Sequence, residues 1–190
     1  MDVLNPETVI EDSLETAFNL KAYLRIISEI QRDDFIATPD FRKMFNGFYR
    51  VRQKTAAWYD TYYKLLEEQK KADRPFREIL QYLESVNGAI DVSFVSKMMA
   101  AVDPSLPIWD RYVLQNLGLL QRWEKLNGKD KGRRIDEAER IYEDIKVWYA
   151  TFIRSKDGKA CIAAFDSAMP NYTKKLTAVK KVDYLLWSKR

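Results

Sequence analysis

The segment at 75–118 constrains the fold more than any other part of the chain, because it contains two apolar helical stripes separated by one tight turn. Asn87-Gly88 marks that turn, since glycine adopts positive φ without strain and asparagine tolerates it better than most residues. The apolar residues before the turn are spaced for one helix face: Phe76, Ile79, Leu80 and Leu83. We therefore predict a helix from about Pro75 to Val86 that enters a hairpin.

The second helix of this hairpin follows Asp91, which stands at the position of an N-cap with its carboxylate able to accept from backbone N–H groups. Its apolar positions are Val92, Val95, Met98, Met99 and Val102, and it should end before Pro104. A third helix then begins after Pro107-Ile108-Trp109-Asp110, which places the Asp110 carboxylate near a helix N-terminus.

This hairpin, followed by Pro107-Ile108-Trp109-Asp110-Arg111-Tyr112-Val113 and Leu117-Gly118-Leu119, resembles the helix-hairpin-helix DNA glycosylase superfamily. In that family a glycine-rich hairpin grips a DNA phosphate, and a Pro-x-Asp segment supplies the catalytic aspartate. The resemblance covers about a fifth of the chain. It implies that Asp110 is the catalytic residue and that Trp109 or Tyr112 shapes the pocket. It also implies contacts to the DNA backbone by Asn87, Gly88, Ala89, Lys97 and Arg111.

The sequence departs from the family pattern at the hairpin. The family usually has Gly-Val-Gly there, whereas this chain has Gly88 alone. The lysine with which bifunctional members attack the sugar would fall near Ile90 or Asp91, and Lys97 lies further along on a different helix face. An active enzyme would therefore be monofunctional, with water as the nucleophile. The alternatives are a non-enzymatic interaction module that kept the fold without the chemistry, and an enzyme acting on another substrate.

A second resemblance lies at the C-terminus. The segment Lys181-Val182-Asp183-Tyr184-Leu185-Leu186-Trp187 is similar to the ending of uncharacterised bacterial proteins with the same core. This second resemblance implies no catalytic or binding residue.

The composition predicts one all-α domain over residues 1–190 with about eight helices, and the resemblance implies that its helix-hairpin-helix is DNA glycosylase-like. The chain is 46% hydrophobic and contains only 6 glycines and 6 prolines. Besides the hairpin, the apolar period predicts helices at about 12–31, 38–45, 54–71, 135–153, 159–168 and 174–187. We expect Gly47 to end the second of these, and 119–132 to be a loop.

The absence of histidine excludes Ser-His-Asp and Cys-His catalysis as well as histidine-ligated zinc. Cys161 is the single cysteine, and we interpret it as a small core residue rather than a nucleophile. It cannot form an internal disulfide, which favours a cytoplasmic location. We expect no cofactor, no bound metal and no membrane segment, with DNA as the partner in the leading hypothesis and the protein partner and oligomeric state left undetermined.

The charge is distributed unevenly along the chain, whose formal net charge is +4. Residues 1–18 carry acids and no bases, whereas 174–190 carry six bases and Asp183 as the only acid. A second basic stretch is Lys129-Asp130-Lys131-Gly132-Arg133-Arg134. Such segments are suited to binding a polyanion; the alternative is that they are helix ends exposed to solvent.

Three other features have two readings each. The aromatic run from Phe45 to Tyr63 either packs in the core or stacks bases. Asp110 either orients a water molecule beside a sugar or caps its helix. The Val86–Ala89 turn either presents amides to a phosphate or simply joins two helices.

Overall fold

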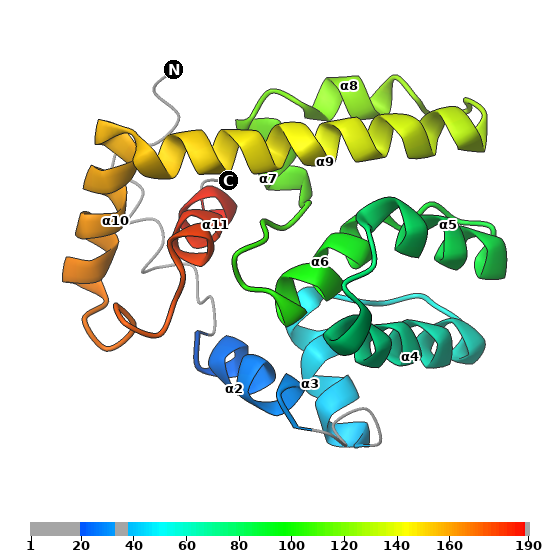
Figure 1. Cartoon of the computed structure of the whole chain (residues 1–190), viewed down its shortest axis with the longest axis horizontal. Helices are drawn as coiled ribbons and strands as arrows, with labels where there is room; N and C mark the ends of the chain where they lie inside the picture. The colour runs from blue at the N-terminus through cyan, green and yellow to red at the C-terminus, as the bar shows by residue number, and fades with distance from the viewer. Residues whose placement is uncertain (1–19, 33–37, 189–190) are drawn as a thin grey trace. The chain divides into compact units, whose positions relative to one another are not determined.

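The computed structural model describes residues 20–32 and 38–188, and the regular secondary structure of this part of the chain is all α-helical, with ten helices and no strand. The predicted all-α class is therefore confirmed. The helix expected from about residue 12 begins outside the described residues, and its described part is α2, Leu20–Ile30. Figure 1 shows the helices in chain order.

The contacts divide the described residues into two compact units, which we treat separately. The first unit ends at Asp103 and the second begins at Pro104. Two compact units can still unfold as one cooperative domain. The expectation of one domain over 1–190 therefore stays a prediction.

The first unit consists of five helices whose bounds largely follow the sequence prediction. After α2 these are α3 (Pro39–Tyr49), α4 (Ala56–Ala72), α5 (Phe76–Asn87) and α6 (Val92–Val102). Thr55 caps α4 by accepting a hydrogen bond from the amide of Trp58 at 3.2 Å. Gly47 does not end α3, because the helix continues for two residues to Tyr49 and is followed by Arg50 as its C-cap in the left-handed region.

Aromatic rings fill the centre of the first unit. Trp58 stacks on Tyr62 with ring centroids 4.8 Å apart, and Phe45 lies 6.1 Å from Tyr62. The most deeply buried rings are Phe41, Phe45, Trp58, Tyr62 and Tyr63. The aromatic run is thus mainly core, and these rings are not available to stack on bases.

The second unit contains α7 (Arg111–Asn116), α8 (Leu120–Glu124), α9 (Lys131–Arg154), α10 (Lys156–Ala168) and α11 (Ala178–Ser188). α9 is the long helix that crosses the upper part of Figure 1, and α10 turns away from its C-terminal end. The contacts of α11 are with α7, α9 and α10. α11 therefore packs against three helices of this unit.

The sequence prediction misses one helix of this unit and places the starts of two others too late. The expected loop at 119–132 contains α8, which is too short to show a hydrophobic period. α9 begins before Ile135, because Asp130 caps it by accepting from the amide of Arg133 at 3.0 Å. Ser155 likewise caps α10 through the amide of Gly158 at 3.0 Å, so this helix begins before Lys159.

Candidate functional site

Asp110 occupies the N-cap position of α7. Its Oδ1 accepts a hydrogen bond from the amide of Tyr112 at 2.9 Å, and the side chain remains partly exposed. The carboxylate makes no other hydrogen bond or ion pair with a described residue. The capping interpretation of Asp110 is correct, and one of its two carboxylate oxygens is left for other partners.

A buried polar cluster lies in the same unit as Asp110, and we name it the Asp183 cluster after its central residue. The Asp183 carboxylate accepts from Tyr149 Oη at 2.5 Å, from Lys180 Nζ at 2.7 Å and from the amide of Ile108 at 3.5 Å. The side chains of Lys180 and Asp183 are 1% and 6% exposed. The cluster ties α9 and α11 to the segment that leads into Asp110.

Tyr149 connects this cluster electrostatically to Asp110. Burial raises the pKa of Tyr149 well above its usual value, and the negative charges of Asp183 and Asp110 raise it further. The phenol therefore remains protonated and can donate to Asp183 throughout the neutral range. Its sensitivity to both carboxylates indicates that Asp110 lies close to the cluster.

The segment before Asp110 is held by further contacts within the second unit. Tyr142 Oη donates to the carbonyl of Pro107 at 3.0 Å, and Trp109 is buried with its ring edge-on to Trp123 at 5.2 Å. Tyr112 is half-buried. The pocket-shaping role expected of Trp109 or Tyr112 stays a prediction. Arg111 is exposed and makes no ion pair with a described residue.

The Asn87-Gly88 turn forms as expected, with Gly88 at φ 73°. Two backbone amides of this turn already donate hydrogen bonds within the protein. The Gly88 amide donates to the carbonyl of Glu84 at 2.6 Å, and the Ala89 amide donates to Asn87 Oδ1 at 2.7 Å. A phosphate at this turn would therefore have to displace existing hydrogen bonds.

The expectation for the Asp91 side chain is wrong. Asp91 is the N-cap residue of α6, but its carboxylate makes no capping hydrogen bond. It accepts instead from Lys54 Nζ at 2.6 Å, Trp58 Nε1 at 2.9 Å and Asn87 Nδ2 at 3.1 Å. A charge-assisted bond to an ammonium group is stronger than a bond to a neutral amide, which explains the choice of partner.

Lys97 lies on α6 with its ammonium group 5.5 Å from the centre of the Phe94 ring. The hairpin residues and Lys97 belong to the first unit, and Asp110 with Arg111 belongs to the second. The residues that the resemblance implies as a DNA-binding and catalytic site therefore belong to two different units.

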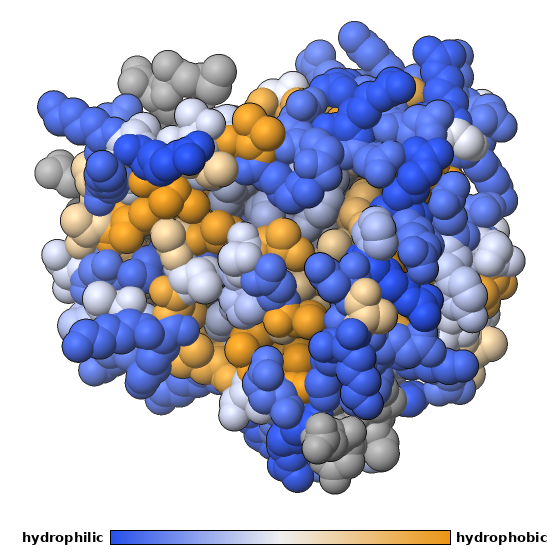
Figure 2. Space-filling model, in the orientation of Figure 1, coloured by the Kyte–Doolittle hydropathy of each residue, from blue (hydrophilic) through white to orange (hydrophobic). Residues whose placement is uncertain are grey.

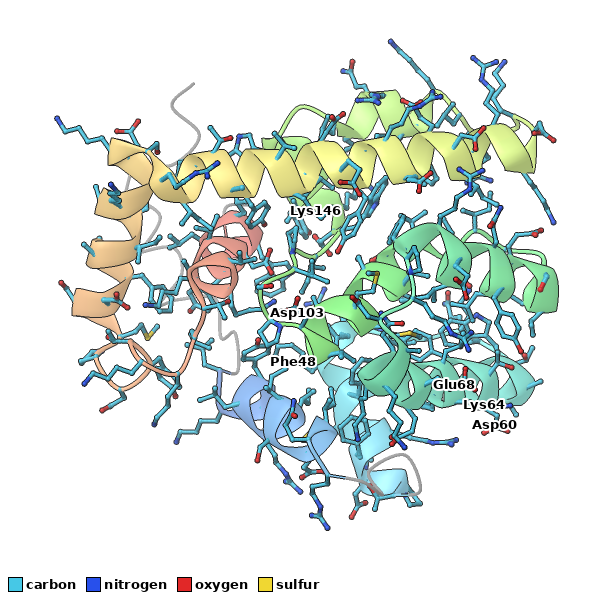
Figure 3. The ribbon with its side chains drawn as sticks, in the orientation of Figure 1. Phe48, Asp60, Lys64, Glu68, Asp103 and Lys146 are labelled. Atoms are coloured by element: carbon cyan, nitrogen blue, oxygen red, sulfur yellow. The ribbon has the colours of Figure 1, made fainter. Side chains whose placement is uncertain are left out.

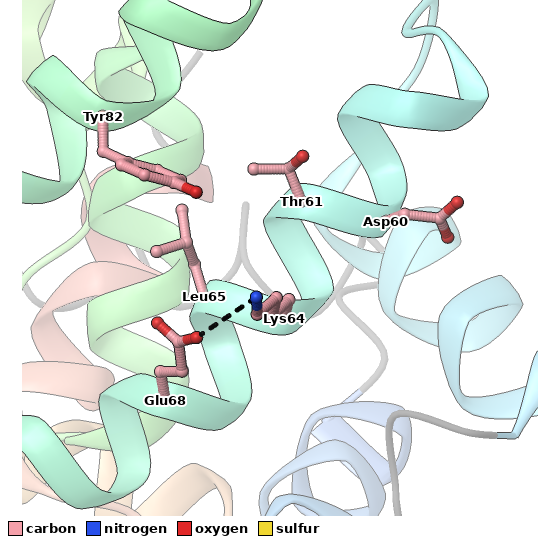
Figure 4. A pocket seen from close by; sticks show the side chains of 6 residues that line it. All are labelled: Asp60, Thr61, Lys64, Leu65, Glu68 and Tyr82. Atoms are coloured by element: carbon pink, nitrogen blue, oxygen red, sulfur yellow. Dashed lines mark ion pairs between the residues drawn. The ribbon is translucent and has the colours of Figure 1, made fainter.

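A small groove between α4 and α5 contains none of the residues singled out from the sequence. It has a volume of about 240 Å³ and is lined by Asp60, Thr61, Lys64, Leu65, Glu68 and Tyr82. Figure 4 shows the Tyr82 ring beside Leu65 and the ion pair between Lys64 and Glu68, which are 4.0 Å apart. In Figure 3, Asp60, Lys64 and Glu68 are labelled along α4, and their spacing of four residues was the only sequence signal for this groove.

The charged groups of this groove already have partners. Asp60 accepts from Arg42 at 2.8 Å, and Glu68 accepts from Arg74 at 2.9 Å. The groove therefore has no carboxylate left over for a cationic ligand.

The basic segment at 174–190 is not simply a solvated helix end. Lys180 is buried against Asp183, and Lys181, which is also buried, lies 2.6 Å from Asp166. Both lysines are thus neutralised within the second unit. The sequence shows the Lys180–Asp183 spacing, but the apolar surroundings of the pair depend on tertiary packing.

Acidic residues of α9 form ion pairs with basic residues of the second unit. Arg122 of α8 donates to Glu137 and Asp144, each at 2.5 Å. Within the described residues, no group of three or more acidic or cysteine side chains is arranged to hold a metal ion.

No family model, curated protein or solved structure matches this chain. None of the described helices is long and apolar enough to cross a lipid bilayer.

Proposed function

We propose that this chain is a DNA-binding protein of the helix-hairpin-helix DNA glycosylase type, in which Asp110 assists base excision. Asp110 would orient a water molecule, or stabilise the positive charge that develops on the sugar as the base departs. No lysine would form a covalent intermediate, so the reaction would release the base without cleaving the DNA strand.

One observation carries this proposal: the Asp110 carboxylate is partly exposed and spends only one oxygen on its helix cap. A catalytic carboxylate needs a defined orientation and an oxygen that can reach the substrate. The amide of Tyr112 supports the first requirement, and the second oxygen supports the other. Arg111, exposed beside it, could contact a phosphate.

The experiment that tests the proposal compares wild type with Asp110→Asn. Asparagine caps a helix about as well as aspartate, so this substitution removes the charge while preserving the start of α7. The wild-type protein should release a base from at least one of a panel of duplexes that each carry a single damaged base. Asp110→Asn should lose this activity by about 10²-fold or more, which is the usual size of a general-base contribution.

Two further measurements accompany this comparison. Fluorescence anisotropy should show that wild type and Asp110→Asn bind a duplex containing an abasic-site analogue with similar affinity. Borohydride should trap no covalent adduct. Equal excision by both proteins would overturn the role of Asp110, and a trapped adduct would overturn the monofunctional mechanism.

A second candidate function is a helical interaction module without catalysis. The hairpin favours it, because the amides of Gly88 and Ala89 already donate to Glu84 and Asn87, and Lys54 already pairs with Asp91. Salt dependence separates the two candidates. Binding to DNA through several phosphates weakens steeply as the salt concentration rises, which would support the DNA-binding candidate. An absence of DNA binding even at low salt would support the interaction module.

A further inference from the structure

The N-terminal end of α9 carries a concentration of positive charge that we name the α9 basic surface. Its four exposed members precede or begin the helix, and the fifth is half-buried in the first turn; they are Lys125, Lys129, Lys131, Arg133 and Arg134. Figure 2 shows hydrophilic residues around the N-terminal end of α9, which is labelled in Figure 1. Asp130, the acid among them, uses Oδ1 to cap α9 through the Arg133 amide.

The fold does not explain this charge. Cations at a helix N-terminus are disfavoured by the helix dipole, so the four members at 129–134 oppose the stability of α9. Lys125 is the C-cap residue of α8, where the dipole favours a cation. Lys125, Lys129 and Arg133 make no ion pair with a described residue. By contrast, three basic residues elsewhere on α8 and α9 are paired with acids: Arg122 with Glu137 and Asp144, Arg140 with Glu137, and Lys146 with Glu143.

Aromatic contacts connect the α9 basic surface to the Asp110 segment. The Arg134 guanidinium lies over the ring of Trp123 at 5.3 Å, and Trp123 meets Trp109 edge-on at 5.2 Å. Trp109 directly precedes Asp110. The Nε of Arg134 is buried and has no hydrogen-bond partner among the described residues, so stacking on Trp123, rather than an Nε hydrogen bond, holds this guanidinium.

We propose that the α9 basic surface binds the phosphodiester backbone of a nucleic acid beside Asp110. The proposal rests on the proposed function and names the part of the second unit that would hold the DNA. Basic side chains next to a partly buried tryptophan suit a phosphate backbone with its bases. A membrane surface fits less well, because Trp123 packs between Trp109 and Arg134 and offers no exposed apolar anchor.

The test is a charge reversal with a matched control. The test variant is Lys129→Glu with Arg133→Glu, and the control is Lys21→Glu with Lys71→Glu, two exposed lysines of the first unit. Each lysine or arginine replaced by glutamate changes the charge by −2, so both double variants lower the formal net charge from +4 to 0. Any difference between them therefore reflects where the charge lies.

Binding is measured by fluorescence anisotropy with a duplex and a single-stranded oligonucleotide at several salt concentrations. The test variant should bind at least about tenfold more weakly than wild type at low salt, and its salt slope should fall by about 1–2, as expected for one or two lost phosphate contacts. The control should lose much less affinity. Glutamate in the first turn of α9 favours the helix dipole, so the melting temperature of the test variant should stay the same or rise.

The possible outcomes distinguish this inference from the proposed function. Equal losses of DNA affinity in the test and control variants would overturn the proposed role of the α9 basic surface. Unchanged binding by the test variant would overturn it too. In both cases any Asp110-dependent excision would still stand. A selective loss in the test variant, together with excision that is insensitive to Asp110→Asn or absent, would support the surface and overturn the catalytic proposal. Binding to vesicles rich in phosphatidylserine, without binding to either oligonucleotide, would overturn both.

Discussion

The ammonium group of Lys180 lies 2.7 Å from the carboxylate of Asp183, one turn apart on α11, and both side chains are almost completely buried. Removing one partner of such a pair leaves a charge without compensation in a medium of low polarity. Asp183 also accepts from Tyr149 and from the amide of Ile108, so it joins the pair to the Asp110 segment.

We expect Asp183→Asn to lower the free energy of unfolding by about 3–5 kcal/mol, the usual result of breaking a buried ion pair. Urea denaturation at neutral pH measures the change. The matched control is Glu143→Gln, because Glu143 and Lys146 form a pair at 2.6 Å with the same spacing, but their side chains are 56% and 35% exposed. The control should cost about 0–1 kcal/mol, and similar losses in the two variants would contradict the importance of burial.

The Lys54–Asp91 pair anchors the start of α6 to the segment before α4. Replacing Lys54 by methionine leaves a carboxylate that is only 10% exposed with neutral donors alone. We expect a loss of about 1.5–3 kcal/mol by urea denaturation. Lys64→Met is the control, since the Lys64 side chain is 75% exposed and lies 4.0 Å from Glu68. A control that is destabilised as much as Lys54→Met would show that the pair has no special role.

Substitution by alanine should change the stability of the protein in opposite directions at two glycines. A Cβ at Gly158 would lie 1.8 Å from the carbonyl oxygen of Phe152, so the backbone around Ser155 would have to move. A Cβ at Gly47, inside α3, would meet nothing within 4 Å. Gly158→Ala should cost about 1–3 kcal/mol or more, whereas Gly47→Ala should stabilise by about 0.5–1 kcal/mol. Thermal melts of both variants test this, and a stabilised Gly158→Ala protein would refute the close contact.

Buried tyrosines should make the protein unstable in alkali. Burial raises the pKa of Tyr62, Tyr63 and Tyr149 above the usual tyrosine value of 10.0. Between the unfolded and folded pKa values the unfolded chain binds fewer protons, so the free energy of unfolding falls as pH rises above about 10. These phenols contribute their full stabilisation below that pH. Absorbance titration at 295 nm should show exposed tyrosines ionising first and the buried group ionising together with loss of helical circular dichroism. Ionisation of all tyrosines in one early step, with the helices intact, would contradict the burial.

Asp110 should contribute to stability through its cap alone. Asp110→Ala removes the acceptor for the Tyr112 amide and should cost about 1 kcal/mol, whereas Asp110→Asn should cost close to nothing. Chemical denaturation of both variants measures the difference. An equal loss in both would mean that the carboxylate charge itself stabilises the fold.

Helix ends that depend on nearby residues were readable from the sequence, and those that depend on packing were not. The Asn87-Gly88 turn was predictable because positive φ is a property of glycine itself. Gly47 looked like a helix end for the same reason, but it takes a helical conformation and α3 continues past it. α8 was missed because five residues are too few to show a period.

The candidate site was predictable only in part. Asp110 was placed correctly at a helix N-cap, since capping involves residues two or three positions apart. The partners of Asp91 were not predictable, because Lys54 is 37 residues away and Trp58 is 33 residues away. The Asp183 cluster was missed for the same reason, since Tyr149 lies 34 residues before Asp183.

The sequence by itself determined that this protein is built of helices and where most of them begin and end, because the helical period and the capping groups act over a few neighbouring residues. Only the tertiary structure decided which carboxylates are neutralised: Asp91 pairs with Lys54 and Asp183 with Lys180, whereas Asp110 pairs with no cation among the described residues. Asp183 also accepts a hydrogen bond from the neutral phenol of Tyr149. The physical reason is that an ion pair forms where packing brings two distant side chains together and removes water from around them, and no local pattern encodes that meeting.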